Sequence, residues 1–201
     1  MDAGVVSETM DAFKPIIEVA ALLRGFNRPW YVAGGWAVDL FLGHETREHE
    51  DVDIAILRKD QTELRAHLAG WSFEKVVEGN RAVWMEGEWL DPPVHEIHGT
   101  RKDGSPRQLE ILLNESKDGF WRFRRNPAVT RPLDRIGLRT PSGVPFLAPE
   151  VVLLFEAKAP ARKHVQDFER VRPLLDSEPR EWLRSALQAC HPGHPWLLLL
   201  G

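Results

Sequence analysis

The segment from Val32 to Ile56, VAGGWAVDLFLGHETREHEDVDIAI, constrains the fold more than any other part of the chain. A short apolar strand runs into a glycine pair, and helical apolar spacing follows from Trp36 to Leu42. A second strand then begins with Asp51 and Asp53, whose side chains project to one face and repel each other unless a cation lies between them. This order predicts that the second strand lies beside the first and brings the aspartates close to the glycines.

Two interpretations of the glycine pair remain open at this point. Without β-carbons, Gly34 and Gly35 let backbone N–H groups at a helix N-terminus approach a phosphate. The simpler interpretation is a tight turn between a strand and a helix. Only the expected proximity of the aspartates favours the phosphate-binding interpretation, because a triphosphate binds next to metal ions.

The paired aspartates suit phosphoryl chemistry. Two divalent ions held by carboxylates clamp the attacking and the leaving oxygen of an in-line displacement, and magnesium prefers such hard oxygen ligands. A third carboxylate would complete such a site. Glu110 in QLEILLN is favoured over Glu96 in VHEIHG, and Glu110 is either a metal ligand or a general base. An ordinary half-exposed strand position would also accommodate it.

The remaining chain is predicted to be α+β, with a mixed sheet flanked by helices. Helices are expected over residues 7–24, 61–68, 165–175 and 180–189, and strands in SFEKVV, RAVWME, HEIHG and QLEILLN. From APEVVLLFEAKA onward the pattern is mostly helical, and residues 196–200 are expected to end the core as a helix. We therefore expect one sheet-containing domain over residues 1–147 and a helical C-terminal part over residues 148–201 packed on it.

Composition limits the possible partners. The 201 residues are 43% hydrophobic, enough for a sizeable core, and the net charge of −4 comes with scattered basic residues that disfavour a long nucleic-acid partner. The single cysteine, Cys190, allows no internal disulfide, and the first residues lack the features of a signal peptide. No stretch is suited to a membrane span. The sequence predicts a cytoplasmic protein.

The motif GGWAVDLFLG followed by TREHEDVDI resembles the nucleotidyltransferases of the DNA polymerase β superfamily. It is most similar to the branch of aminoglycoside and lincosamide nucleotidyltransferases, which transfer a nucleoside monophosphate to a drug hydroxyl. The likeness is strongest from Val32 to Ile56 and continues less sharply through FLAPEVVLLFEAKAPARKHVQDF and PGHPWL. It implies a nucleotidyltransferase fold for residues 1–147.

The resemblance also implies an activity and its site. We expect transfer of a nucleoside monophosphate, AMP in the first place, from ATP or another NTP to a hydroxyl of a small molecule such as an aminoglycoside or lincosamide. Two Mg²⁺ ions would be bound by Asp51, Asp53 and Glu110, which are also the catalytic residues. The nucleotide would be bound by Gly34, Gly35, Arg47 and Lys158.

Several alternatives stay open. Arg47 contacts phosphate or pairs with Asp39 or Glu50, and His95 with His98 lacks the pattern of a zinc site. The acids of residues 86–96 either bind a polyamine-like acceptor or form a solvated loop. A protein of a different class, an antitoxin-like or regulatory module that nucleotidylates or binds a partner protein, is the alternative function.

Overall fold

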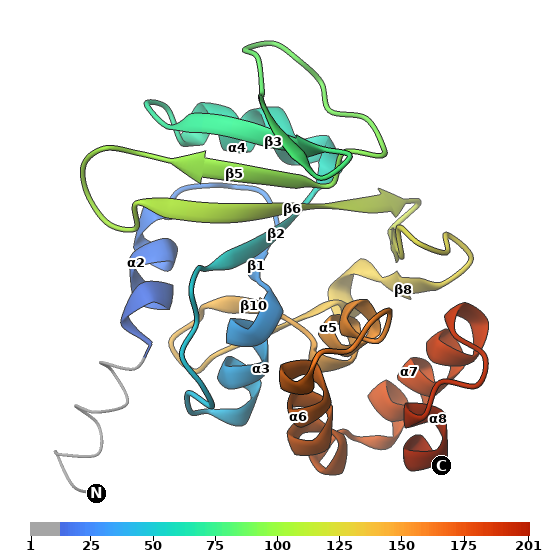
Figure 1. The fold of residues 1–201 in the computed structure, drawn as a ribbon. Coiled ribbons are helices and arrows are strands. Elements are labelled where there is room, and N and C mark those ends of the chain that lie inside the picture. The colour runs from blue at the N-terminus through green and yellow to red at the C-terminus, as the bar shows by residue number, and fades with distance from the viewer. Residues whose placement is uncertain (1–12) are drawn as a thin grey trace, which may run out of the picture.

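The structure is a computed structural model that describes residues 13–201 (Figure 1). The helices are α2 (Lys14–Leu22), α3 (Gly34–Leu42), α4 (Gln61–His67), α5 (Pro149–Glu156), α6 (Arg162–Val171), α7 (Ser177–Cys190) and α8 (Trp196–Leu200). The strands are β1 (Trp30–Val32), β2 (Asp53–Leu57), β3 (Ser72–Val77), β4 (Asn80–Val83), β5 (Glu96–Thr100), β6 (Gln108–Lys117), β7 (Phe120–Arg122), β8 (Thr130–Pro132), β9 (Gly137–Arg139) and β10 (Pro145–Leu147). Residues 7–12 of the first predicted helix, and the predicted absence of a signal peptide, lie outside the described residues.

The ten strands form a mixed sheet, as predicted. Eight of them follow the order β4-β3-β5-β6-β2-β1-β10-β9, while β7 pairs with the far end of β6 and with β8. The pairs β2/β6 and β1/β10 are parallel, and the other pairs are antiparallel. As the glycine motif predicts, β1 and β2 are neighbours in the sheet.

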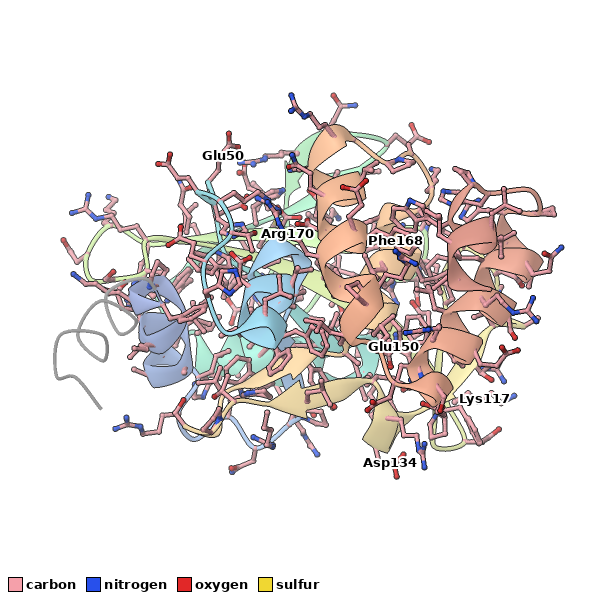
Figure 2. The ribbon with its side chains drawn as sticks, turned by 90° about the horizontal axis from the view of Figure 1, so that it is seen from below. Glu50, Lys117, Asp134, Glu150, Phe168 and Arg170 are labelled. Atoms are coloured by element: carbon pink, nitrogen blue, oxygen red, sulfur yellow. The ribbon has the colours of Figure 1, made fainter. Side chains whose placement is uncertain are left out.

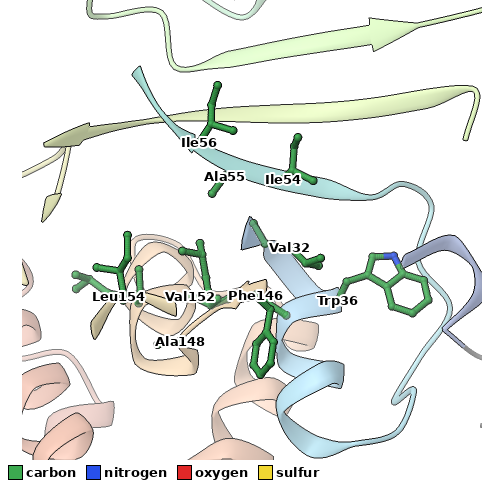
Figure 3. Packing of buried hydrophobic residues seen from close by; sticks show 14 of the residues in the cluster. Val32, Trp36, Ile54, Ala55, Ile56, Phe146, Ala148, Val152 and Leu154 are labelled. Carbon is green, nitrogen blue, oxygen red and sulfur yellow. The ribbon is translucent and has the colours of Figure 1, made fainter. Parts of the chain in front are cut away.

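Helices cover both faces of the central strands. Figure 1 shows α4 on one side of the sheet and α3, α5, α6, α7 and α8 on the other. In β2 the side chains of Ile54 and Ile56 point away from α5 and that of Ala55 points towards it (Figure 3). Residues 54–57 are all buried, which is typical of a strand with both faces covered. By the same alternation, Asp53 shares the face of Ala55 and points to the side of α3 and α5.

Helix α3 begins and ends at glycines. The helix starts at Gly34, so the glycine pair forms its first turn rather than preceding it. Trp36, Ala37 and Val38 are buried. At the other end Gly43 has a φ of 78° and donates its N–H to the carbonyl of Asp39, which is the usual glycine termination of a helix.

Some predicted boundaries were wrong. Asp51 lies in a bend just before β2, so only Asp53 belongs to the strand. The strand predicted in RAVWME ends at Val83, and Trp84, which follows it, is buried in the core. The strands β7 to β10 were not predicted, since each has only three residues and such a short segment carries no periodicity.

The last strand ends at Leu147, and only helices follow from Pro149 onward. Helix α5 packs against both α3 and α7, so the helical part is in contact with the sheet layer through α3. The division into units at residues 147 and 148 stays a proposal. None of the helices within residues 13–201 has the length and apolar character needed to cross a bilayer.

Candidate active site

The N-terminus of α3 lies against the aspartates. Gly34 has a φ of 57°, a conformation that favours glycine, and a β-carbon there would fall onto the Asp53 carboxylate. A β-carbon on Gly35 would meet the side chains of Arg47 and His49. Among residues 13–201 no side chain caps the N-terminus of α3, and the first turn of this helix holds no acidic residue. The first N–H groups of this helix and its dipole therefore favour an anion beside Asp53.

Three carboxylates converge next to this helix end. Because β2 and β6 are parallel and in register, Asp53 lies level with Glu110. The N–H of Glu110 donates to the carbonyl of Val52, and the N–H of Ala33 donates to that of Asp53. One carboxylate oxygen from each of Asp51, Asp53 and Glu110 lies within 4.8 Å of the others. Both aspartates thus project to the same site, although only one of them lies in the strand.

The crowding of these acids perturbs their ionisation. Burial and the charges of Asp51 and Glu96 raise the pKa of Asp53 from 3.8 to about 6. Burial and the charges of Asp53 and Glu96 raise the pKa of Glu110 from 4.5 to about 8. A cation among these carboxylates would relieve their repulsion. Their hard oxygen donors match the ligands that magnesium prefers, so the residues present fit a magnesium site.

Trp36 fixes the backbone of the bend that carries Asp51. Its indole Nε1 donates to the carbonyl of Asp51 at 3.0 Å. The Trp36 ring also packs on the imidazole of His49, with 4.3 Å between centroids. The aromatic side chain of α3 therefore positions both the bend and the residues that precede it.

A buried hydrogen-bonded chain links α3 to the loop before the bend. The carboxylate of Asp39, which is fully buried, accepts bonds from Thr46 Oγ1 at 2.7 Å and from His49 Nε2 at 2.6 Å. Although burial opposes ionisation, these hydrogen bonds lower the pKa of Asp39. Arg47 donates from Nη1 to His49 Nδ1 at 3.0 Å, which assigns the imidazole proton to Nε2.

The position of Arg47 speaks against the interpretation that it pairs with Asp39 or Glu50. It forms no ion pair with Asp39 or Glu50; its ionic partner is Asp167 of α6, at 3.6 Å. Its guanidinium lies against Gly35, at the end of the helix where an anion is favoured. Its contact with phosphate stays a prediction.

Lys158 is not placed with the carboxylates. It lines an open hollow together with Arg125, Asn126, Ala189, Cys190 and His191. The lysine whose charge lowers the pKa of Asp53 is Lys163, in the first turn of α6. The sequence holds both lysines in one segment, and only the docking of α6 distinguishes them.

Glu96 lies beside these carboxylates but one strand further from Asp53. It pairs across the sheet with Leu112, whereas Glu110 pairs with His98. His98 donates from Nε2 to Glu96 at 2.7 Å and accepts at Nδ1 from Arg81 at 3.1 Å. Glu96, His98 and Glu110 form a second group of ligand atoms within 4.8 Å of one another. Because Arg81 occupies the Nδ1 lone pair and Nε2 carries the proton, the imidazole has no lone pair free for a metal.

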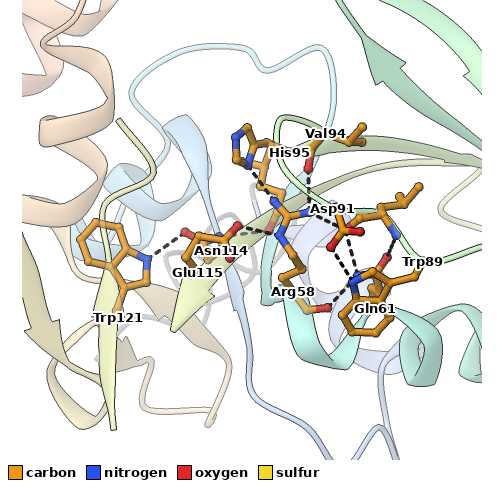
Figure 4. Close-up of polar contacts among 11 residues, drawn as sticks. Arg58, Gln61, Trp89, Asp91, Val94, His95, Asn114, Glu115 and Trp121 are labelled. Carbon is orange, nitrogen blue, oxygen red and sulfur yellow. Dashed lines mark hydrogen bonds and ion pairs between the residues drawn. The ribbon is translucent and has the colours of Figure 1, made fainter. Parts of the chain in front are cut away.

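Sequence reasoning missed Arg58, which anchors the segment between β4 and β5 (Figure 4). Its side chain is buried and donates to the carbonyls of Leu90 and Val94 at 2.8 and 2.7 Å. It also bonds Glu115 at 2.6 Å and His95 Nδ1 at 2.9 Å. An arginine directly after a buried strand was the available signal, because a buried guanidinium needs several acceptors.

The same segment contains most of the acids considered for acceptor binding. Glu88 forms an ion pair with Lys75, and Asp91 accepts a bond from Trp89. Glu86 is exposed. Of these acids, only Glu96 contributes to the raised pKa of Asp53 and of Glu110.

Comparisons with known proteins find relatives by sequence and by structure. The family model described as aminoglycoside-2''-adenylyltransferase matches residues 15–136. A 2''-aminoglycoside nucleotidyltransferase of Klebsiella pneumoniae is 42% identical over 107 residues, which are 49% of this chain and 60% of the relative. One of Escherichia coli is 42% identical over 96 residues, which are 43% of this chain and 54% of the relative. The matches thus span 54–60% of the length of these relatives.

Solved structures share the fold. The crystal structure of ANT(2")-Ia in complex with adenylyl-2"-tobramycin superposes with a TM-score of 0.57 at 22% identity, covering 87% of this chain and 95% of that one. The lincomycin-bound lincosamide antibiotic adenylyltransferase LnuA gives a TM-score of 0.55 at 18% identity, covering 81% and 97%. At these identities the likeness shows the fold alone.

Proposed function

The chain belongs to the aminoglycoside-2''-adenylyltransferase family, and from this premise we propose that it is a magnesium-dependent nucleotidyltransferase. Its reaction is the transfer of a nucleoside monophosphate, AMP in the first place, from an NTP to a hydroxyl of a small molecule of the aminoglycoside or lincosamide class. The observation that carries the proposal is the convergence of Asp51, Asp53 and Glu110 beside the uncapped N-terminus of α3.

In this reaction the acceptor oxygen forms a bond to the α-phosphorus, and the bond from that phosphorus to the bridging oxygen breaks to release pyrophosphate. When two magnesium ions are bound by Asp51, Asp53 and Glu110, they supply positive charge to the phosphates and to the attacking oxygen. The N–H groups at Gly34 and Gly35 and the Arg47 guanidinium hold the triphosphate. We propose Lys158 as a contact of the nucleotide. We add Lys163, because its charge lowers the pKa of Asp53.

Two roles fit Glu110, and one variant separates them. As a metal ligand it needs its charge, and as a general base it accepts the proton of the acceptor hydroxyl, for which a raised pKa is suited. Glu110→Gln removes the base but keeps an oxygen donor. Transfer that fails while magnesium still stabilises the variant would assign the base, and loss of both would assign the ligand.

The proposed function is tested by incubating the protein with magnesium and each labelled NTP against a panel of aminoglycosides and lincosamides. A mass gain of one nucleoside monophosphate on an acceptor is expected, together with release of pyrophosphate. Asp53→Asn should abolish the gain while the far-ultraviolet circular dichroism stays unchanged. A cell lysate in a parallel reaction tests for a protein acceptor. The proposal fails if no small molecule gains mass or if Asp53→Asn retains the wild-type rate.

A further inference from the structure

Asp167 of α6 is a buried acid without a hydrogen-bond donor. Its side chain is 1% exposed, and neither carboxylate oxygen has a hydrogen-bond partner among residues 13–201. Its nearest cationic groups are Arg47 Nη2 at 3.6 Å and Arg170 Nη1 at 3.7 Å, which attract it without a hydrogen bond. A buried carboxylate in such a setting costs stability, and an apolar residue of similar size would usually cost less.

A second acid makes the position of Asp167 still less favourable for folding. In Glu156 of α5, the Oε2 atom is buried and has no hydrogen-bond partner in the part of the chain that the structure describes. Burial and the charge of Asp167 raise the pKa of Glu156 to about 8. Stability therefore does not account for Asp167, and its role is better sought in what it faces.

Asp167 faces Arg47 across the contact between α6 and α3. Figure 2 shows α6 between α3 and the C-terminal helices, with Arg170 on the side of α3 and Phe168 on the opposite side. Phe168 stacks on Trp196 at 4.2 Å, which fixes the rotation of α6 and turns Asp167 towards Arg47. Since the described helices α3 and α6 are in contact, this orientation is a property of the packed core.

Two buried acids on different helices thus hold one guanidinium. From α3, Asp39 acts through His49, which accepts the bond from Arg47 Nη1. From α6, Asp167 attracts Nη2. The guanidinium is held against Gly35, and the Arg47 side chain as a whole is still 24% exposed, so a ligand can reach it. An arginine with two fixed sides loses less conformational entropy when it binds an anion.

We propose that Asp167 is a positioning residue for the nucleotide, which holds the Arg47 guanidinium over Gly35 so that it meets the phosphates already oriented. This inference rests on the proposed function, because it assumes that the triphosphate lies at the N-terminus of α3. It adds a residue of the helical C-terminal part to the binding of the donor. Asp167 itself touches no phosphate and acts through Arg47.

The test is calorimetric titration of magnesium-ATP into the wild type and four variants of the full chain. Asp167→Asn keeps the size of the side chain and removes its charge, and we expect about 10-fold weaker binding, the effect of misplacing one charge-assisted hydrogen bond. Arg170→Gln is the matched control, since Arg170 lies beside the other oxygen of the same carboxylate. It should leave the affinity unchanged within about twofold.

A double-mutant cycle separates positioning from a structural role. Arg47→Gln should also weaken binding, and Asp167→Asn added to Arg47→Gln should weaken it no further. A structural role predicts the same effect of Asp167→Asn in both backgrounds, together with a lower melting temperature. Equal affinities of the wild type and Asp167→Asn, or additive effects in the cycle, would overturn the inference. A wild type that binds no magnesium-nucleotide would instead overturn the proposed function on which it rests.

Discussion

The crowded carboxylates predict that the metal-free protein loses stability as the pH rises from about 5 to about 9. Both Asp53 and Glu110 have a raised pKa, so the folded state binds more protons than the unfolded state within this window. Their contribution is fully present below the ordinary pKa of a carboxyl group. It is lost as the pH rises through about 6 for Asp53 and about 8 for Glu110.

The magnitude follows from the two shifts. One pKa unit corresponds to about 1.4 kcal/mol, and Glu110 moves from 4.5 to about 8 while Asp53 moves from 3.8 to about 6. The repulsion between the two groups enters both shifts, so they cannot be added. Allowing for that and for their partial exposure, we expect a loss of about 2 to 4 kcal/mol in the free energy of unfolding.

The assay is urea unfolding at several pH values, with a chelator or with magnesium. Without metal, the wild type should lose stability relative to Glu110→Gln as the pH rises, because the variant cannot ionise at this position. Magnesium should remove most of the difference in the wild type by neutralising the repulsion. Glu169→Gln, on the exposed surface of α6, serves as the control and should run parallel to the wild type.

The reasoning would be refuted by parallel stability curves of the wild type and Glu110→Gln across this pH range. It would equally fail if magnesium stabilised both proteins to the same extent at low and high pH. Either result would mean that the carboxylates do not repel one another in the folded protein.

Three further substitutions have defined outcomes. Gly34→Ala should cost about 2 to 4 kcal/mol in urea unfolding, because the new methyl meets the Asp53 carboxylate; Gly43→Ala, with a similar φ but open space, should cost only about 1 to 2. Arg58→Lys should cost about 2 to 4 kcal/mol, since one ammonium cannot replace bonds to four partners, and an unchanged urea midpoint would contradict this. Asp39→Asn should cost about 1 to 3 kcal/mol and change the fluorescence of the tryptophan that packs on His49; an unaltered spectrum would show that the imidazole does not need the carboxylate.

The local order of the site was predictable from the sequence. The glycine pair, the apolar spacing from Trp36 to Leu42 and the stop at Gly43 predicted β1, α3 and their connection, and the structure confirms these elements. Such features depend on residues a few positions apart, whose periodicity and backbone preferences act within one element. The motif also indicated that Asp53 would lie near Gly34, because consecutive elements are usually neighbours.

Which later acid joins the aspartates depended on strand register. The sequence favoured Glu110, which lies between two apolar residues, over Glu96, but it could not show which of the two strands pairs with β2. The parallel pairing of β2 with β6 puts Glu110 level with Asp53, and Glu96 then lies one strand further away. The register between strands so far apart along the chain depends on which side chains the whole sheet buries on its core faces.

Which basic residues lie near the site was likewise decided only by the tertiary structure. Lys158 and Lys163 are close in sequence, but Lys158, between α5 and α6, lines the hollow with Arg125 and Cys190, whereas the charge of Lys163 acts on Asp53. Arg47 finds its ionic partner in Asp167, on a helix that follows the entire sheet along the chain. A charged side chain has no sequence signature for its partner, because the partner is chosen by the angle at which two helices pack and by the rotation that buried rings such as Phe168 impose.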